Sequence, residues 1–143
     1  MQRTIRSIVE GQNIVAAPAR TSVSDAAHSM RQHNVGAILV VESERLVGIF
    51  TERDSLYRVV AENRDARRTQ LADVMTPDPQ TVHPDDPFVR ALNLMHAGGF
   101  RHVPVVEDGK LLGMVSARDA LGPELEDFIY ALLRQEQAHD ILA

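Results

Sequence analysis

Apolar and polar residues follow each other along this chain in two blocks that have the same order. In residues 24–34 apolar residues recur at helical spacing, after a serine that can cap a helix. Residues 35–41 are almost continuously apolar, which is typical of a buried strand. Polar residues at 42–45 predict a hairpin turn, and 46–50 read as the returning strand. Because residues 52–60 become helical again, the block predicts helix, strand, strand, helix.

The second block repeats this order with clearer start and stop signals. Prolines precede a predicted helix at 87–97, and Gly98-Gly99 ends it. A strand at 100–106 leads to Asp108-Gly109, a pair that hairpin turns favour. The returning strand is expected at 111–115.

The two blocks match with a constant offset of 65 residues. The segment Gly48–Asp54 returns as Gly113–Asp119, and ten of 34 pairs are identical when 23–56 is compared with 88–121. A solenoid needs three or more repeats to bury its stacking faces, so two copies favour a paired module with pseudo-twofold symmetry. The predicted fold class is α+β.

The repeats divide the chain into four parts. These are a first repeat at 7–60, a linker at 61–72, a second repeat at 73–122 and a C-terminal amphipathic helix at 123–143. A repeat of about 60 residues buries too little surface to be stable alone, so both should fold as one body. The last helix carries an apolar stripe that predicts core or dimer packing: Leu125, Phe128, Ile129, Leu132 and Leu133.

Composition and charge exclude several classes of function. The chain has 143 residues, no cysteine and a formal net charge of −5. Without cysteine there are no disulfides or thiolate metal sites, and an acidic chain is a poor match for nucleic acid. No apolar run reaches 18 residues and no signal-like segment opens the chain, which predicts no membrane association and a cytoplasmic location.

The sequence gives little support to an enzyme. No nucleophile elbow, Walker segment or Gly-rich dinucleotide loop is present. Six histidines occur, but their spacings match no metal motif, so no metal site and no catalytic residue are predicted: His28, His33, His83, His96, His102 and His139.

Candidate binding chemistry lies at the end of each returning strand. Thr51 and Asp54 in the first repeat match Ser116 and Asp119 in the second, each with a hydroxyl at the strand end and a carboxylate one turn later. A carboxylate there can accept hydrogen bonds from a vicinal diol such as ribose. A helix N-terminus also presents N–H groups and a positive dipole end that suit a phosphate.

An arginine precedes each of these aspartates. Arg53 and Arg118 could pair with phosphate oxygens, and diol, phosphate and an apolar slot together describe a nucleotide. The simpler explanation is that the hydroxyl and the aspartate only cap a helix. The Arg-Asp pair is kept in both repeats while its neighbours change, which favours a ligand.

These segments, together with Val74–Pro77, Pro104–Gly113 and the 65-residue spacing, carry a resemblance to a known family. The chain resembles a tandem CBS-domain (cystathionine β-synthase domain) pair of the stand-alone bacterial type. The resemblance implies two pseudo-twofold-related β-α-β-β-α units that form one CBS-pair module with two clefts. Members bind AMP, ADP, ATP, NAD or S-adenosylmethionine there and commonly form flat homodimers.

The resemblance also implies roles for particular residues. Asp54 would hold ribose hydroxyls with help from Thr51, and Asp119 would do so with Ser116. Each base pocket would be completed by the other repeat, with Phe100, Arg101 and His102 facing Asp54, and with Val35, Gly36 and Ala37 facing Asp119. Backbone contacts to adenine are expected from Val15, Ala16, Gln80 and Thr81.

The expected function is therefore regulatory: a ligand-sensing module for an adenine nucleotide or related adenosyl ligand, with no catalytic cofactor and an unknown effector protein. The alternative is a ligand-free interaction or dimer scaffold module. That alternative predicts that Arg53 and Arg118 form salt bridges and that side chains close the clefts.

Overall fold

A computed structural model describes the backbone of residues 3–142 and the side chains of residues 3–136. Its elements are α1 (Ile5–Val9), β1 (Ala16–Ala17), α2 (Val23–His33), β2 (Ala37–Glu42), β3 (Arg45–Thr51), α3 (Glu52–Asp54), the π-helical turn η1 (Ser55–Val60), α4 (Leu71–Val74), β4 (Thr76–Pro77), α5 (Phe88–Gly98), β5 (His102–Glu107), β6 (Lys110–Ser116), the 3-10 turn η2 (Ala117–Asp119) and α6 (Gly122–Leu142). The predicted α+β class is confirmed.

Helix α2 begins and ends where local chemistry predicts. The hydroxyl of Ser22 accepts a hydrogen bond from the Asp25 amide at 3.0 Å, so Ser22 is the N-cap. Asn34 ends the helix in the left-handed conformation. In the second repeat Gly99 does the same for α5, with φ of 70°.

Several boundaries differ from the prediction, and β2 begins at Ala37 instead of residue 35. Strand β5 begins at His102 instead of residue 100, because the amides of Gly99 and Phe100 both donate to the Met95 carbonyl and so belong to the end of α5. After Ser116 the second repeat has only the turn η2 before α6 begins at Gly122. Pro123 has no amide proton and fits the first turn of that helix, where no donor is needed.

Each repeat forms a small sheet, and the first one borrows a strand. The order in the first sheet is β1-β2-β3-β4, and the second contains β5 and β6. β4 follows the linker, yet it pairs antiparallel with β3. In the second repeat, a single parallel bridge between Val82 and Val105 corresponds to the β1–β2 pair Ala17–Val40.

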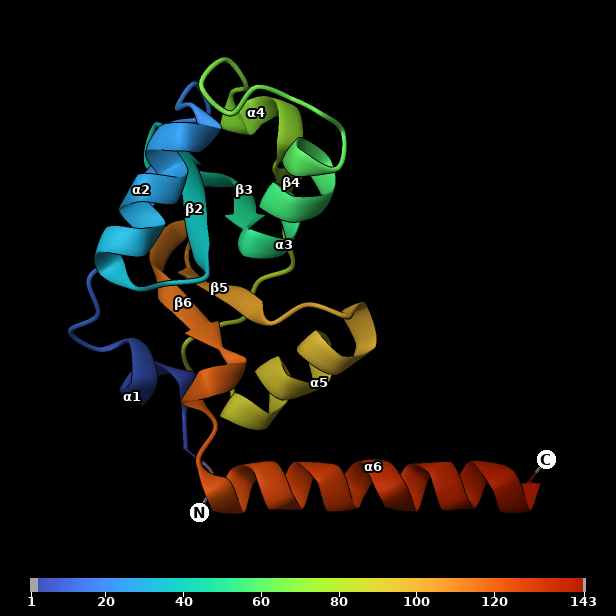
Figure 1. The fold of residues 1–143 in the computed structure, drawn as a ribbon. Coiled ribbons are helices and arrows are strands. Elements are labelled where there is room, and N and C mark those ends of the chain that lie inside the picture. Colours follow the sequence, from blue (N-terminus) through green and yellow to red (C-terminus); the bar gives the residue numbers. More distant parts are fainter. Residues whose placement is uncertain (1–2, 143) are drawn as a thin grey trace.

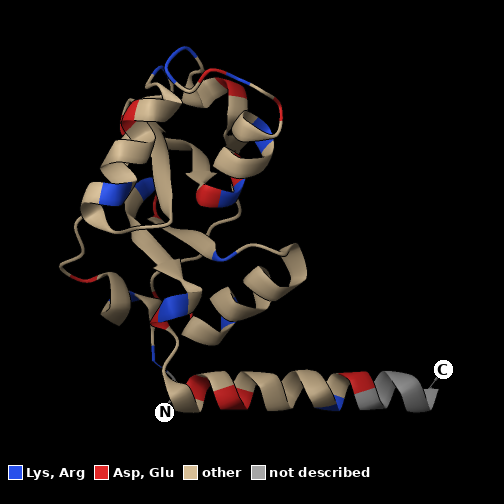
Figure 2. Cartoon of the chain, in the orientation of Figure 1, with Lys and Arg blue, Asp and Glu red and all other residues tan. Residues whose placement is uncertain are grey.

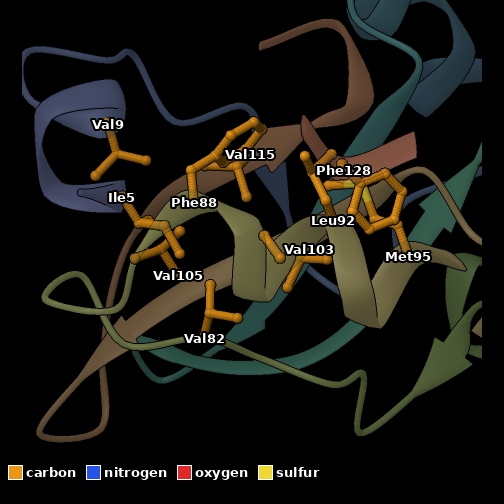
Figure 3. Packing of buried hydrophobic residues seen from close by; sticks show 11 residues of the cluster. Ile5, Val9, Val82, Phe88, Leu92, Met95, Val103, Val105, Val115 and Phe128 are labelled. Atoms are coloured by element: carbon orange, nitrogen blue, oxygen red, sulfur yellow. The ribbon is translucent and has the colours of Figure 1, made fainter. Parts of the chain in front are cut away.

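The two hydrophobic cores do not follow the sequence boundaries of the repeats. Ile5 and Val9 of α1 pack into the second repeat's core with Phe88 and Val115, as Figure 3 shows. Conversely, Leu71 and Val74 of α4 are buried in the first repeat's core. The segment leading into each repeat thus completes the core of the other one, and in Figure 1 α1 lies beside the lower half and α4 in the upper half.

A third cluster joins the two sheets. Ala37, Leu39 and Ile49 of the first repeat are buried, with Leu111 and Met114 of β6 packed against them. The repeats therefore stack through their sheets, which brings the ends of β3 and β6 close to the opposite repeat.

Helix α6 covers most of the range in which a C-terminal amphipathic helix is predicted, and it runs beneath the second repeat (Figure 1). Phe128 is buried in the second core, whereas Leu125, Ile129 and Leu133 are exposed. The end of the predicted range 123–143 lies outside the described residues. In the described part of the chain, every helix is too short or too polar to cross a membrane.

Candidate functional site

The first candidate site is the turn where β3 ends and α3 begins. Thr51 and Asp54 form a reciprocal cap: the Thr51 hydroxyl accepts from the Asp54 amide at 3.2 Å, and Asp54 Oδ2 accepts from the Thr51 amide at 3.0 Å. The other oxygen, Asp54 Oδ1, lies 3.6 Å from Arg58 Nε. Asp54 is buried. Helix capping therefore uses one carboxylate oxygen, while the second is paired with Arg58 and, with two lone pairs, can also accept from a further partner.

A cavity of about 750 Å³ opens against this turn. It brings together seven of the predicted residues from both repeats: Thr51, Arg53, Asp54, Gln80, Phe100, Arg101 and His102. Thr81, predicted beside Gln80, does not line it. The other walls include the apolar side chains Ile49, Leu56 and Tyr57. A slot with an aromatic ring, apolar sides and a carboxylate suits a ligand that is part base and part sugar.

The position of Phe100 depends on a glycine. A methyl group on Gly98 would lie only 2.0 Å from the Phe100 ring, so this ring packs against the bare end of α5. The sequence interpretation gave Gly98 only the role of ending the helix. The absence of a side chain at Gly98 also allows the ring of Phe100 to reach the cavity.

The second candidate site has a similar cap, formed by Ser116 and Asp119, but a much smaller cavity. Asp119 Oδ2 accepts from the Ser116 amide at 2.7 Å. The cavity nearby is about 230 Å³, and its lining contains six predicted residues: Val35, Gly36, Ser116 and Arg118, which were predicted for this site or its phosphate, and Arg101 and His102, which also line the larger cavity. Asp119 and Ala37 line neither cavity, and Ala37 is fully buried.

Backbone pairing explains part of this asymmetry. In the first repeat β4 pairs with β3 beside Ile49. At the matching place the Gln12 side chain bonds to the Met114 backbone instead, with Oε1 accepting from the amide at 2.8 Å and Nε2 donating to the carbonyl at 3.0 Å. Val15 and Ala16, predicted to contact adenine, line neither cavity and pair with Leu39 of β2.

The two predicted phosphate-binding arginines make matching contacts across the repeats. Arg53 Nη1 donates to the Gly99 carbonyl at 3.0 Å, and Arg118 Nη2 donates to the Asn34 carbonyl at 3.4 Å. Gly99 and Asn34 are the C-caps of α5 and α2. Each arginine therefore holds the end of a helix in the other repeat. The sequence interpretation missed these contacts because the acceptors are backbone atoms, which residue types do not reveal.

His102 lies on the wall shared by the two cavities. Burial lowers the pKa of its imidazole, while Glu52 counteracts this and Arg118 and Arg101 reinforce it; Asp119 favours the charged form slightly.

A cluster outside both cavities was not anticipated from the sequence. Atoms of His83, Asp85 and Glu107 that could bind a metal lie within 4.8 Å of one another. Arg6 already pairs with both carboxylates, at 3.0 Å to Asp85 and 2.7 Å to Glu107, and it lowers the pKa of Asp85. The guanidinium already pairs with one oxygen of each carboxylate that a cation would need, so we interpret this cluster as an ion-pair network. In Figure 2 the segments of the ribbon that carry basic residues (blue) and acidic residues (red) are interspersed along both halves.

The repeated units, their exchanged leading segments and the cavities at their junction define a module built from two paired repeats. The CBS domain family model matches the chain twice, at residues 5–54 and 71–122. The chain belongs to the CBS domain family, and the predicted membership is confirmed.

Relatives agree with this assignment. The mitochondrial CBS domain-containing protein CBSX3 of Arabidopsis thaliana is 42% identical over 105 residues, which is 70% of this chain and 51% of that protein. An uncharacterized Methanopyrus kandleri protein is 34% identical over 86% of this chain and 62% of its own length. The chain thus spans between half and two thirds of these relatives.

Solved structures show the same fold. A protein with CBS domains from Burkholderia ambifaria has a TM-score of 0.76 at 28% identity, covering 92% of this chain and 95% of that one. A CBS-domain protein from Agrobacterium tumefaciens has a TM-score of 0.75 at 27% identity, covering 82% and 95%.

Proposed function

We propose that this protein is a regulatory ligand-sensing module that binds an adenine nucleotide or related adenosyl ligand in the cleft beside Asp54. The observation that carries the proposal is the cavity of about 750 Å³, in which a buried carboxylate from one repeat faces Phe100, Arg101 and His102 from the other. A ligand there would contact both repeats at once. A ligand that binds one arrangement of the repeats more tightly than another would favour that arrangement, which is what a sensor requires.

Two proteins of the same fold support the kind of ligand. A CBS domain protein from Pyrobaculum aerophilum is complexed with AMP, at 24% identity and a TM-score of 0.78. A CBS domain pair of 23% identity is complexed with 5′-methylthioadenosine and S-adenosylmethionine. At these identities the likeness extends to the fold alone, so the choice among AMP, ADP, ATP, NAD and S-adenosylmethionine remains open.

Asp54→Asn tests the ribose contact. Losing a hydrogen bond to a charged group costs about 1.5–3 kcal/mol, so the affinity should fall roughly ten- to a hundredfold. Isothermal titration calorimetry with the adenosyl ligand that most raises the melting temperature of the wild type would measure this. A ligand that binds Asp54→Asn as tightly as the wild type would contradict the assignment.

Asp119→Asn is the matched control, because Asp119 occupies the same position in the same kind of helix cap. Both substitutions remove a capping carboxylate, but only Asp54 lines the large cavity. We therefore expect Asp119→Asn to leave binding in that cavity unchanged. If the wild type binds two ligand molecules and Asp119→Asn binds one, the second molecule occupies the cleft beside Asp119, as the sequence predicts.

The alternative function, an interaction or dimer scaffold, is favoured by exposed apolar residues at matching positions of the two repeats. Leu56 and Val60 are exposed, and so are their counterparts 65 residues later, Leu121 and Leu125. A second copy of the chain could cover such side chains. We propose that the protein is a homodimer that buries these residues, and the molar mass in solution, measured by light scattering, tests it.

A further inference from the structure

The two cavities share one wall, which three side chains form. Glu52, Arg101 and His102 line the cavity of about 750 Å³ and also the smaller one of about 230 Å³. If ribose lies at Asp54, groups on its 5′ side can extend past this wall toward Ser116 and Arg118. The charge of the wall therefore decides how many phosphates fit there.

Glu52 places a carboxylate at this junction. A methyl group on Gly36 would meet Glu52 Oε1 at 3.1 Å and His102 Nε2 at 3.3 Å, so both side chains converge on the bare backbone of Gly36. The counterpart of Glu52 in the second repeat is Ala117. The negative charge on the shared wall therefore comes from the first repeat and has no counterpart in the second.

The cations around the junction are mostly occupied. Arg53 and Arg118 each donate to a helix-end carbonyl. The lowered pKa of His102 leaves its imidazole neutral at neutral pH. Among the described side chains, Arg101 is the junction arginine that has neither a hydrogen bond nor an ion pair. The Glu52 carboxylate, which lines the same two cavities, carries the opposite charge. This balance suits one phosphate group and disfavours a chain of three.

We infer that Glu52 is a specificity-determining residue that restricts the Asp54 cleft to a nucleoside monophosphate. The inference rests on the proposed function. AMP carries about two negative charges and ATP about four, and the terminal phosphates of ATP would approach the Glu52 carboxylate. Like charges a few ångströms apart in a partly solvated site weaken binding by roughly tenfold.

Glu52→Gln tests the inference, because it keeps the shape of the side chain and removes its charge. Affinities for AMP and ATP would be measured by calorimetry at neutral pH with a chelator, since Mg²⁺ would neutralise the phosphate chain. In the wild type we expect AMP to bind about tenfold or more tightly than ATP. In Glu52→Gln the affinity for ATP should rise about five- to tenfold, and that for AMP by less than about threefold.

Two controls separate charge at the junction from other effects. Glu62→Gln removes an equal charge from the exposed linker and should change neither affinity. Glu52→Ala gives the first repeat the residue found at Ala117 and should reproduce the gain for ATP. Equal gains for both ligands in Glu52→Gln, or a wild type that prefers ATP, would overturn the inference while the proposed function stands. A wild type that binds neither ligand nor any other adenosyl compound would overturn both.

Discussion

At the scale of one residue, His102 links protonation to the stability of the fold. Its pKa is lowered below the ordinary value of 6.5, chiefly by burial, with Arg118 and Arg101 adding to the effect while Glu52 and Asp119 partly offset it. Below pH 6.5 the unfolded chain therefore binds a proton that the folded chain resists. Stability is lost as the pH falls from 6.5 toward the folded pKa, and above pH 6.5 this contribution is constant.

His102→Asn should remove this loss. A single histidine contributes at most about 1.4 kcal/mol per pH unit, so urea unfolding between pH 7.5 and 5.5 should show a smaller decrease in the variant than in the wild type. His28→Asn, which replaces an exposed histidine on α2, controls for loss of an imidazole elsewhere. Identical decreases in wild type and His102→Asn would show that this side chain does not carry the dependence.

At the scale of the elements, the repeated glycine of each returning strand has a packing role. A methyl group on Gly48 would meet Met75 Sδ at 2.4 Å and the Thr76 carbonyl at 3.1 Å, and one on Gly113 would meet Gln12 Oε1 at 2.5 Å. At both positions the neighbour belongs to the segment that leads into the other repeat. The glycine allows this segment to lie directly on the strand.

Gly48→Ala and Gly113→Ala should therefore each destabilise the fold. Overpacking at such a contact typically costs about 1–3 kcal/mol, which the midpoint of urea unfolding would report. Gly122→Ala is the matched control, because nothing lies within 4 Å of the added methyl group. An unchanged midpoint for Gly48→Ala would mean that β4 does not rest on β3 in solution.

The helices and strands could be predicted from the sequence better than the segments against which they pack. Periodicity and turn residues identified α2, β2, β3, α5, β5 and β6, because each signal is local to its own segment. It could also assemble most of the Asp54 cleft, through the family resemblance. The exchange of α1 and α4 between cores could not be predicted, because a repeat fixes which residues correspond and says nothing of which copy they pack against.

The unequal sizes of the cavities could not be predicted from the residues expected to line them. Those residues differ in chemistry, with the polar Arg101 and His102 expected beside Asp54 and the small Gly36 and Ala37 beside Asp119, but Arg101 and His102 line both cavities and Ala37 lines neither. The contact of Gln12 with Met114 had no sequence signal, since a side chain there replaces a strand that exists in the other repeat. The replacement of a strand by a side chain can be recognised only when the backbone structure is known.

At the scale of the whole molecule, the exchanged segments should make each repeat depend on sequence that precedes the other. Ile5 of α1 and Leu71 of α4 are both fully buried, in the second and first core respectively. Removing either side chain leaves a cavity and should cost about 2–5 kcal/mol. The local consequence should differ, because each substitution opens a different core.

Native-state hydrogen exchange can separate these effects. In Ile5→Ala the amides of β5 and β6 should lose more protection than those of β2 and β3, although Ile5 precedes the first repeat. Leu71→Ala should produce the opposite pattern and is the matched control. If Ile5→Ala instead weakened β2 and β3 first, the leading segment would pack within its own repeat. If both variants lowered protection equally in all four strands, the two cores would open as one cooperative unit, and ligand binding at their junction would then stabilise the whole chain rather than one repeat.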